Sequence, residues 1–181
     1  MRITGGKYCG RKIQAPRSPL TRPSTDRFRE TAFSLLPELP SGGVLDICSG
    51  SGAMGIEAMS RGANFFYAIE SHRAVAKTLK QNIRNIDPLM NYTIDTRGLQ
   101  YALPSLQHTS FPLIIADPPY ANSALYSTIY RLCAQYRLLT PNGLLMVEHD
   151  HRSPLPPPPY QLVRYKKIGH SVLSFYSLLN N

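Results

Sequence analysis

The feature that most constrains this chain is an apolar run that ends in a glycine-rich loop. Residues 44–52 are VLDICSGSG, and Ala53 and Gly55 follow. This pattern predicts a buried strand, a tight loop and a helix, as in an open α/β sheet. Glycine permits positive φ angles and close approach of the backbone to a bound nucleotide. The spacing Gly50-x-Gly52-x-x-Gly55 also matches a dinucleotide-binding pattern, so the loop alone does not identify its ligand.

A second apolar run ends in an acid, two prolines and an aromatic residue. Residues 113–116 are LIIA, and Asp117, Pro118, Pro119 and Tyr120 follow. The prolines fix φ and have no N–H, so the turn is rigid and presents carbonyl groups. An ordinary Asp-Pro turn is the alternative, but the buried strand directly before it and the nucleotide loop upstream disfavour that interpretation.

These four residues suit the methylation of an exocyclic base amine. Asp117 and the carbonyl of Pro118 can accept the two N–H groups, which points the nitrogen lone pair at a methyl donor. The Tyr120 ring can stack on an unpaired base, an interaction worth on the order of 1–3 kcal/mol. Methyl transfer from a sulfonium is an in-line displacement that depends on positioning and needs no metal. The two runs together therefore predict S-adenosylmethionine and a flipped-out nucleobase as ligands, and not the cofactor of a dehydrogenase.

The next predicted strand, residues 65–70, ends in a carboxylate. Glu70 lies 18 residues after Gly52, close to the spacing of the acid that binds the ribose hydroxyls of a nucleotide. The alternative for Glu70 is a charge at the start of the following helix.

The chain as a whole alternates predicted strands and helices. Strands are expected at residues 44–48, 65–70, 92–96, 113–117 and 144–148, with helices between them and a turn at 141–143. Residues 161–168 and 171–178 predict a closing antiparallel hairpin. The expected fold is α/β: a Rossmann-like, seven-stranded, mostly parallel sheet in a single domain of residues 1–181, with 1–21 as a small basic β-hairpin extension.

One more helix is predicted before the glycine loop. Ser24 or Thr25 suits its N-cap and Asp26 its first turn, and apolar residues keep helical spacing until Pro37. Arg29 and Glu30 on this helix are either simple surface charges or contacts to the cofactor.

The charge distribution points to a polyanionic partner. The net charge is +9, and residues 1–25 contain no acid. The cations of this stretch are Arg2, Lys7, Arg11, Lys12, Arg17 and Arg22. Concentrated basic charge of this kind is typical of nucleic-acid binding, whereas a merely solvated tail is the alternative.

The cysteines and the lengths of the apolar runs indicate the cellular compartment of the protein. Three scattered cysteines without a C-x-x-C pair indicate a reducing compartment, and neither they nor the histidines have metal-ligand spacing. No apolar run approaches the ~18 residues of a membrane span, and the first residues have no signal-peptide pattern. We expect a cytoplasmic protein without a metal or a membrane partner.

On these motifs the chain resembles the RsmD-type 16S ribosomal RNA guanine-N2 methyltransferases. The resemblance rests on the first eleven residues, residues 22–31 (RPSTDRFRET), residues 46–63 and Asp117-Pro-Pro-Tyr. It implies a class I methyltransferase fold, S-adenosylmethionine as donor, and one guanine of the 16S ribosomal RNA as acceptor, within the small (30S) subunit or its precursor. A monomer is expected.

The resemblance also implies roles for individual residues. Those predicted to contact the methionine end of the cofactor are Asp46, Ser49, Gly50 and Gly52, with Glu70 at the ribose and Asp117, Pro118 and Tyr120 at the acceptor. The chain departs from the family where an acid or amide is expected beside the adenine, because that position falls at Gly98. Asp95 lies three residues earlier, and Leu99 is the candidate that packs against adenine instead.

Two alternatives remain open from the sequence. Asp-Pro-Pro-Tyr also serves adenine-N6 methyltransferases of DNA or other RNA. Only 61 residues follow Tyr120, which leaves no room for a separate DNA-recognition domain and favours a folded RNA substrate bound with the help of the basic extension. The other alternative is a non-catalytic RNA-binding assembly factor with the same fold.

Overall fold

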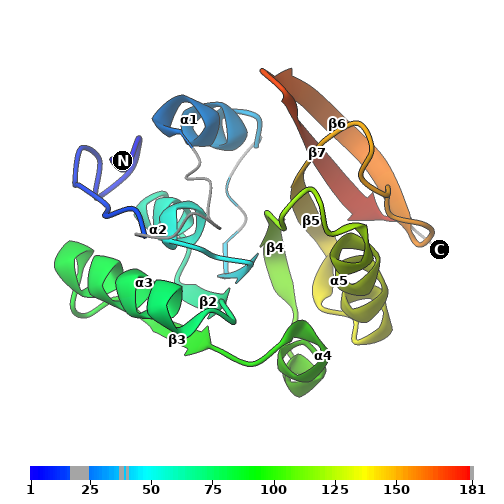
Figure 1. Cartoon of the computed structure of the whole chain (residues 1–181), viewed down its shortest axis with the longest axis horizontal. Helices are drawn as coiled ribbons and strands as arrows, with labels where there is room; N and C mark the ends of the chain where they lie inside the picture. The colour runs from blue at the N-terminus through cyan, green and yellow to red at the C-terminus, as the bar shows by residue number, and fades with distance from the viewer. Residues whose placement is uncertain (17–24, 37–38, 40, 180–181) are drawn as a thin grey trace.

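The computed structural model describes residues 1–16, 25–36, 39 and 41–179, and its centre is one seven-stranded sheet (Figure 1). The strands are β1 Gly43–Ile47, β2 Phe65–Ile69, β3 Tyr92–Asp95, β4 Phe111–Ala116, β5 Leu139–His149, β6 Tyr160–Ile168 and β7 Ser171–Leu178. Their order is β3-β2-β1-β4-β5-β7-β6. Strands β1 to β5 pair in parallel, and β7 is antiparallel to β5 and β6. The predicted Rossmann-like sheet and its terminal hairpin are confirmed.

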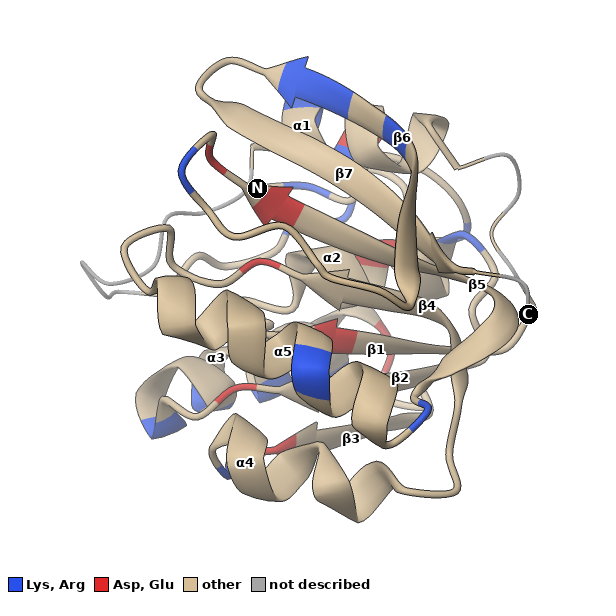
Figure 2. Ribbon diagram, turned by 90° about the vertical axis from the view of Figure 1, so that its right-hand side faces the viewer, with Lys and Arg blue, Asp and Glu red and all other residues tan. Residues whose placement is uncertain are grey.

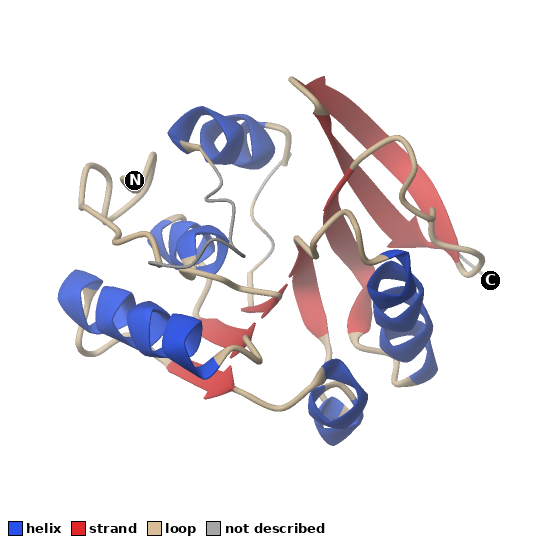
Figure 3. Ribbon diagram, viewed as in Figure 1, coloured by secondary structure: helices blue, strands red, loops and turns tan. Residues whose placement is uncertain are grey.

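Helices cover both faces of the sheet (Figure 3). They are α1 Asp26–Ser34, α2 Ala53–Ser60, α3 Arg73–Ile86, α4 Leu99–Ala102 and α5 Ser123–Gln135, with a 3₁₀ turn η1 at Pro104–Leu106. Side chains alternate across β1, so Val44 packs in the core under α1, α2 and α3, whereas Leu45 packs in the core under α4 and α5. Burial on both faces explains why these strands are continuous apolar runs.

The strand order reverses between β1 and β4, and this is the point where ligands bind in open α/β sheets. Ile47 is paired in register with Ala116, the last residue of β4. The N–H of Asp117 donates to the carbonyl of Ile47, 3.3 Å away. The glycine loop and the Asp117 turn therefore leave the sheet side by side, as the sequence predicted.

Strand β5 corrects one expectation. The turn predicted at residues 141–143 lies inside β5, which begins at Leu139. The ladder passes from the pair Phe111–Leu139 to the pair Leu113–Leu144, so β5 holds extra residues opposite β4 at this point. The proline and glycine interrupt the ladder as a bulge and do not end the strand.

The predicted N-terminal β-hairpin is present in a short form that packs against the rest of the protein. Residues 1–16, here called the N-terminal segment, reverse direction but form a single antiparallel bridge, between Arg2 and Lys12. The segment packs against α2 instead of forming a free arm: the hydroxyl of Thr4 donates to Glu57, and the N–H of Tyr8 to the hydroxyl of Ser60. Backbone bonds join the two halves of the segment, from the N–H of Ile3 to the carbonyl of Arg11 and from the N–H of Ile13 to the carbonyl of Met1, and α2 supplies further acceptors. Residues 17–21 of the predicted extension lie outside the described residues.

Candidate functional site

The glycine loop is held in place by Glu70 at the end of β2. The N–H of Gly50 donates to Oε2 of Glu70 (3.0 Å), and the N–H of His72 donates to Oε1 (2.8 Å). The N–H of Ser49 donates to the carbonyl of Ile69. The nearly buried Glu70 carboxylate thus joins the loop to the start of α3, at the tip of the strand where the sequence placed the ribose contact.

The glycines of the loop serve two different purposes. A Cβ on Gly50, whose φ is +54°, would have only the carbonyl of Cys48 within 4.0 Å, so the loop is open on this side. A Cβ on Gly52 would lie 2.0 Å from Cδ1 of Leu79, and one on Gly55 would lie 2.0 Å from the Phe66 ring. Packing therefore requires glycine at positions 52 and 55, whereas open space lies beside Gly50; the cofactor contacts of Gly50 and Gly52 stay predictions.

Asp46 lies beneath the loop and is fully buried. Its Oδ2 accepts the N–H of Gly55 in the first turn of α2 (3.1 Å), and its backbone carbonyl accepts the hydroxyl of Ser49 (2.7 Å). Burial raises the pKa of Asp46 to about 7. Cys48, which lies between Asp46 and Ser49, has a φ of +62°. This conformation is costly for a residue other than glycine and typically occurs at functional sites.

The region predicted to contact adenine is built around Asp95. Its carboxylate accepts hydrogen bonds from the hydroxyl of Tyr67 and from the Arg97 guanidinium. The Arg97 bonds lower the pKa of Asp95. Leu99, the first residue of α4, is buried at this edge. Asp95 is thus committed to protein partners, whereas the contact of Leu99 with adenine stays a prediction.

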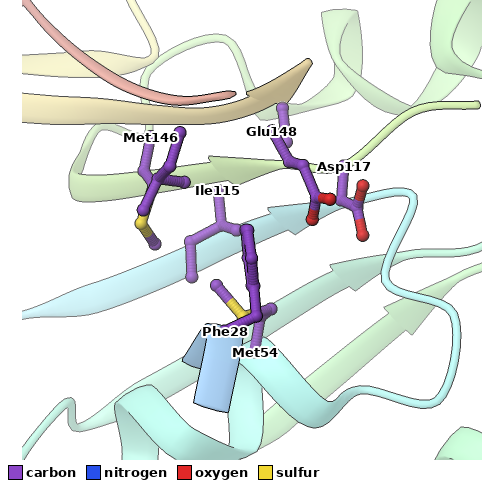
Figure 4. A pocket seen from close by; sticks show the side chains of 8 residues that line it. Phe28, Met54, Ile115, Asp117, Met146 and Glu148 are labelled. Carbon is purple, nitrogen blue, oxygen red and sulfur yellow. The ribbon is translucent and has the colours of Figure 1, made fainter. Parts of the chain in front are cut away.

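The Asp117 turn opens onto a narrow pocket between the sheet and α1 (Figure 4). Asp117 and Glu148, at the ends of β4 and β5, place their carboxylates at one end of it. Apolar side chains form the rest of the wall. These are Phe28, Met54, Ile115, Ala116, Met146 and Leu173.

Tyr120 is fixed at the edge of this pocket through its hydroxyl group. The hydroxyl lies 2.5 Å from Oε1 of Glu148, to which it donates, and 2.6 Å from Oγ of Ser171 on β7. Burial and the neighbouring Glu148 carboxylate raise the pKa of Tyr120, so the hydroxyl stays protonated. The ring is partly exposed and is available for contact with a ligand.

A second tyrosine supports the turn from below. The hydroxyl of Tyr126 on α5 is within hydrogen-bond distance of the carbonyls of Pro118 (3.1 Å) and Glu148 (3.0 Å). A carbonyl oxygen has two lone pairs, so Pro118 can still accept a bond from a substrate amine. The sequence patterns did not reveal Tyr126, Glu148 or Phe28. Only Glu148 had a recognisable signal, as a carboxylate directly after the apolar run of β5.

The predicted site residues of α1, Arg29 and Glu30, have different environments in the structure. Arg29 is fully buried, and its Nη2 lies 2.7 Å from Oδ1 of Asp26 while its Nε lies 3.9 Å from Oε2 of Glu57. Arg29 therefore joins α1 to α2, and its contact with a cofactor stays a prediction. Glu30 is exposed on α1. Arg22 lies outside the described residues.

The N-terminal segment exposes four of the cations predicted to bind RNA, namely Arg2, Lys7, Arg11 and Lys12. Two of them also have protein partners. Nζ of Lys7 lies 3.5 Å from Asp87, and the Arg11 guanidinium donates to the carbonyls of Ile86 and Asn85 at the end of α3. Arg2 and Lys12 flank the single bridge.

Metal sites and membrane spans are both absent from the part of the chain that the structure describes. Among these residues, no group of three or more His, Cys, Asp or Glu side chains is arranged to hold a metal ion. Within the same ranges, no helix has the length and apolar character needed to cross a membrane.

Comparison with known proteins gives consistent matches along the chain. The family model described as conserved hypothetical protein 95 matches residues 1–177. The ribosomal RNA small subunit methyltransferase D of Escherichia coli K12 is 34% identical over 179 residues, which cover 97% of this chain and 89% of that protein. The protein of the same name from Haemophilus influenzae is 31% identical over 173 residues, or 93% and 89% of the two chains.

Solved structures agree with these matches. The "Putative methyltransferase yhhF" of Escherichia coli superposes with a TM-score of 0.85 at 32% identity, covering 100% of this chain and 99% of that one. A precorrin-6y C5,15-methyltransferase from Geobacter metallireducens superposes with a TM-score of 0.70 at 12% identity, covering 93% and 95%. The second likeness concerns the fold alone, which is that of the Rossmann-like class I methyltransferases.

Proposed function

The chain belongs to the conserved hypothetical protein 95 family of RsmD-type ribosomal RNA methyltransferases, and from that membership we propose that it methylates the N2 amine of one guanine in 16S ribosomal RNA. It is an S-adenosylmethionine-dependent rRNA methyltransferase. The observation that carries the proposal is the pairing of β1 with β4, which sets Asp117-Pro-Pro-Tyr directly beside the glycine loop.

The residues at this point of the sheet fit S-adenosylmethionine. Gly50 leaves the loop open on one side, and the Glu70 carboxylate keeps acceptor capacity for ribose hydroxyls beside its two backbone bonds. Asp46, Glu70 and Asp117 form an acidic surrounding that suits a ligand with sulfonium and ammonium charges. When bound, the cofactor supplies an electrophilic methyl group.

In this proposal the chain's own residues hold the amine. Asp117 and the carbonyl of Pro118 accept its two N–H groups, and the carboxylate of Asp117 takes the proton that leaves as the new bond forms. The Tyr120 ring stacks on the flipped base, which every base tolerates because each has a π face. Phe28 and Met54 line the pocket with apolar surface and keep water from the reacting atoms.

The relatives named for the small ribosomal subunit support RNA as the acceptor. We propose that the substrate is folded 16S RNA in the 30S particle or its precursor, and that the enzyme acts in the cytoplasm as a monomer. Adenine-N6 methylation and a purely structural role in assembly are the competing functions.

The test is mass spectrometry of small-subunit RNA from cells with and without the protein. Loss of one N2-methylguanine, restored by the purified enzyme and S-adenosylmethionine, is the expected result. Loss of an N6-methyladenine instead would mean that the acceptor is adenine and not guanine. An unchanged RNA, together with no cofactor binding by calorimetry, would favour the assembly factor.

A further inference from the structure

Strand β6 differs from every other strand of the sheet in its exposure. It is the last strand in the order and lies at the edge of the sheet (Figure 1). Residues 161–167 are all exposed. Three of its large side chains are more than half exposed, namely Leu162 (53%), Val163 (56%) and Tyr165 (66%). An exposed apolar and aromatic strand at a sheet edge commonly marks a binding surface.

The same strand is strongly basic. It carries Arg164, Lys166 and Lys167, which Figure 2 shows along β6, and residues 160–178 contain no Asp or Glu. The acceptor pocket itself is acidic, because Asp117 and Glu148 both line it. A polyanion that brings a base to the Asp117 turn needs positive charge nearby to balance this repulsion.

The register of the hairpin brings one of these charges, that of Lys166, to the face of the sheet that holds the pocket. Lys166 is paired with Leu173, which lines the pocket, and paired residues of an antiparallel ladder point to the same face with Cβ atoms ~5 Å apart. Ile168 is paired with Ser171, whose hydroxyl binds Tyr120. Lys166 therefore lies one strand away from the acceptor pocket.

Resting on the function proposed above, we infer that β6 binds the RNA backbone beside the flipped guanine. Lys166, on the pocket side of this edge strand, and Lys167, on its other side, are the phosphate-binding residues. Tyr165, between them and Arg164, offers a stacking face for a neighbouring base. Arg164 also donates to the carbonyl of Leu35 after α1 (2.8 Å), so part of its guanidinium serves the fold. Lysines on a sheet edge oppose pairing with a second copy of the chain, because like charges would face each other. An RNA backbone meets no such repulsion, because its phosphates are negative.

The test is the double variant Lys166→Gln, Lys167→Gln, with Lys77→Gln, Lys80→Gln on the exposed face of α3 as a control of equal charge. Binding of protein-free small-subunit RNA is measured over a range of salt concentrations. The β6 variant is expected to lower the salt slope by about 1.4–1.8, because two phosphates are no longer neutralised, whereas the control leaves it unchanged. Thermal unfolding and S-adenosylmethionine affinity should match the wild type.

The outcomes separate this inference from the function on which it rests. If the β6 variant keeps the wild-type salt slope while the wild type methylates normally, β6 is not an RNA-binding surface and the proposed function stands. A wild type that methylates no small-subunit RNA contradicts the function, while the slope still decides whether β6 binds RNA. Sedimentation could instead show that the wild type is a dimer and that the β6 substitutions change this dimerisation. That result would assign the sheet edge to self-association and overturn the inference.

Discussion

The hydroxyl of Tyr120 lies 2.5 Å from Oε1 of Glu148, and this bond joins the turn after β4 to the end of β5. Glu148 lines the acceptor pocket together with Asp117. One carboxylate of the pocket is thereby used to orient the aromatic ring, and the other, Asp117, is the group that we propose to hold the substrate amine. The proposal therefore gives separate roles to two carboxylates that line the same pocket.

Replacing Glu148 should misplace the Tyr120 ring. In Glu148→Ala the hydroxyl loses its charged acceptor, a bond worth about 1.5–3 kcal/mol, so we expect kcat to fall at least roughly ten-fold with unchanged S-adenosylmethionine affinity. Glu148→Gln keeps an acceptor at the same position and should retain most of the rate. Steady-state kinetics and calorimetry measure both effects. Normal kcat in the alanine variant would remove Glu148 from the acceptor site.

Asp117→Ala should abolish methyl transfer while cofactor affinity stays within a few-fold of the wild type. Its carboxylate is proposed to hold the amine, and the loop that faces the cofactor is supported independently by Glu70. Asp117→Asn, which keeps one oxygen acceptor, should retain a trace of activity. Transfer is measured with labelled cofactor on small-subunit particles. A parallel loss of cofactor binding would place Asp117 in the donor site instead.

The two strand tips could be predicted from sequence because each motif is local. A buried parallel strand is an apolar run, and the residues just after it are those that reach the ligand. The ring of contacts around Tyr120 could not be predicted in this way. It joins Tyr120 to Glu148 and Ser171, 28 and 51 residues away, through the register of β4, β5 and β7.

The N-terminal segment shows a different limit of sequence patterns. Glycines and alternating apolar residues predicted the chain reversal, but not the side chains of α2 and α3 that also accept hydrogen bonds from this backbone. No local pattern records which helix supplies an acceptor. The same applies to Gly52 and Gly55, whose spacing suggested ligand approach while Leu79 and Phe66 determine their size.

Asn82 on α3 connects the N-terminal segment to the glycine loop. Its Nδ2 donates to the carbonyls of Gln14 and Ser51, both at 2.9 Å, and its Oδ1 accepts the N–H of Gln14. Asn82→Leu leaves these buried groups without partners, so we expect a stability loss of about 2 kcal/mol or more and weaker cofactor binding. Urea unfolding and calorimetry measure both. Gln81→Ala, on the exposed side of α3, serves as the control. Equal stability of the two variants would contradict this link.

The cations of the N-terminal segment should contribute to RNA affinity by neutralising phosphates. The variant Arg2→Gln, Lys7→Gln, Lys12→Gln is expected to flatten the salt dependence of RNA binding by about 0.7–0.9 for each phosphate that is no longer neutralised. Arg11 is left intact because its guanidinium bonds the end of α3, and its replacement would confuse binding with folding. Arg73→Gln, Lys77→Gln, Lys80→Gln on α3 removes the same charge elsewhere. If the two triple variants have equal slopes, the N-terminal segment is not part of the interface.

Burial of Asp46 predicts a pH dependence of stability. Its pKa rises from an ordinary 3.8 to about 7 in the folded chain, so between these values the folded protein holds a proton that the unfolded chain releases. Stability therefore falls as pH rises from about 4 to about 7, and the loss is complete above that range. Asp46→Asn keeps an oxygen acceptor for the N–H of Gly55 but cannot ionise, so this contribution to the slope should vanish. Urea unfolding of both proteins at about pH 5 and about pH 8 measures the difference. The variant should gain stability relative to the wild type at the higher pH, and a difference that is the same at both values would mean that Asp46 is ionised throughout.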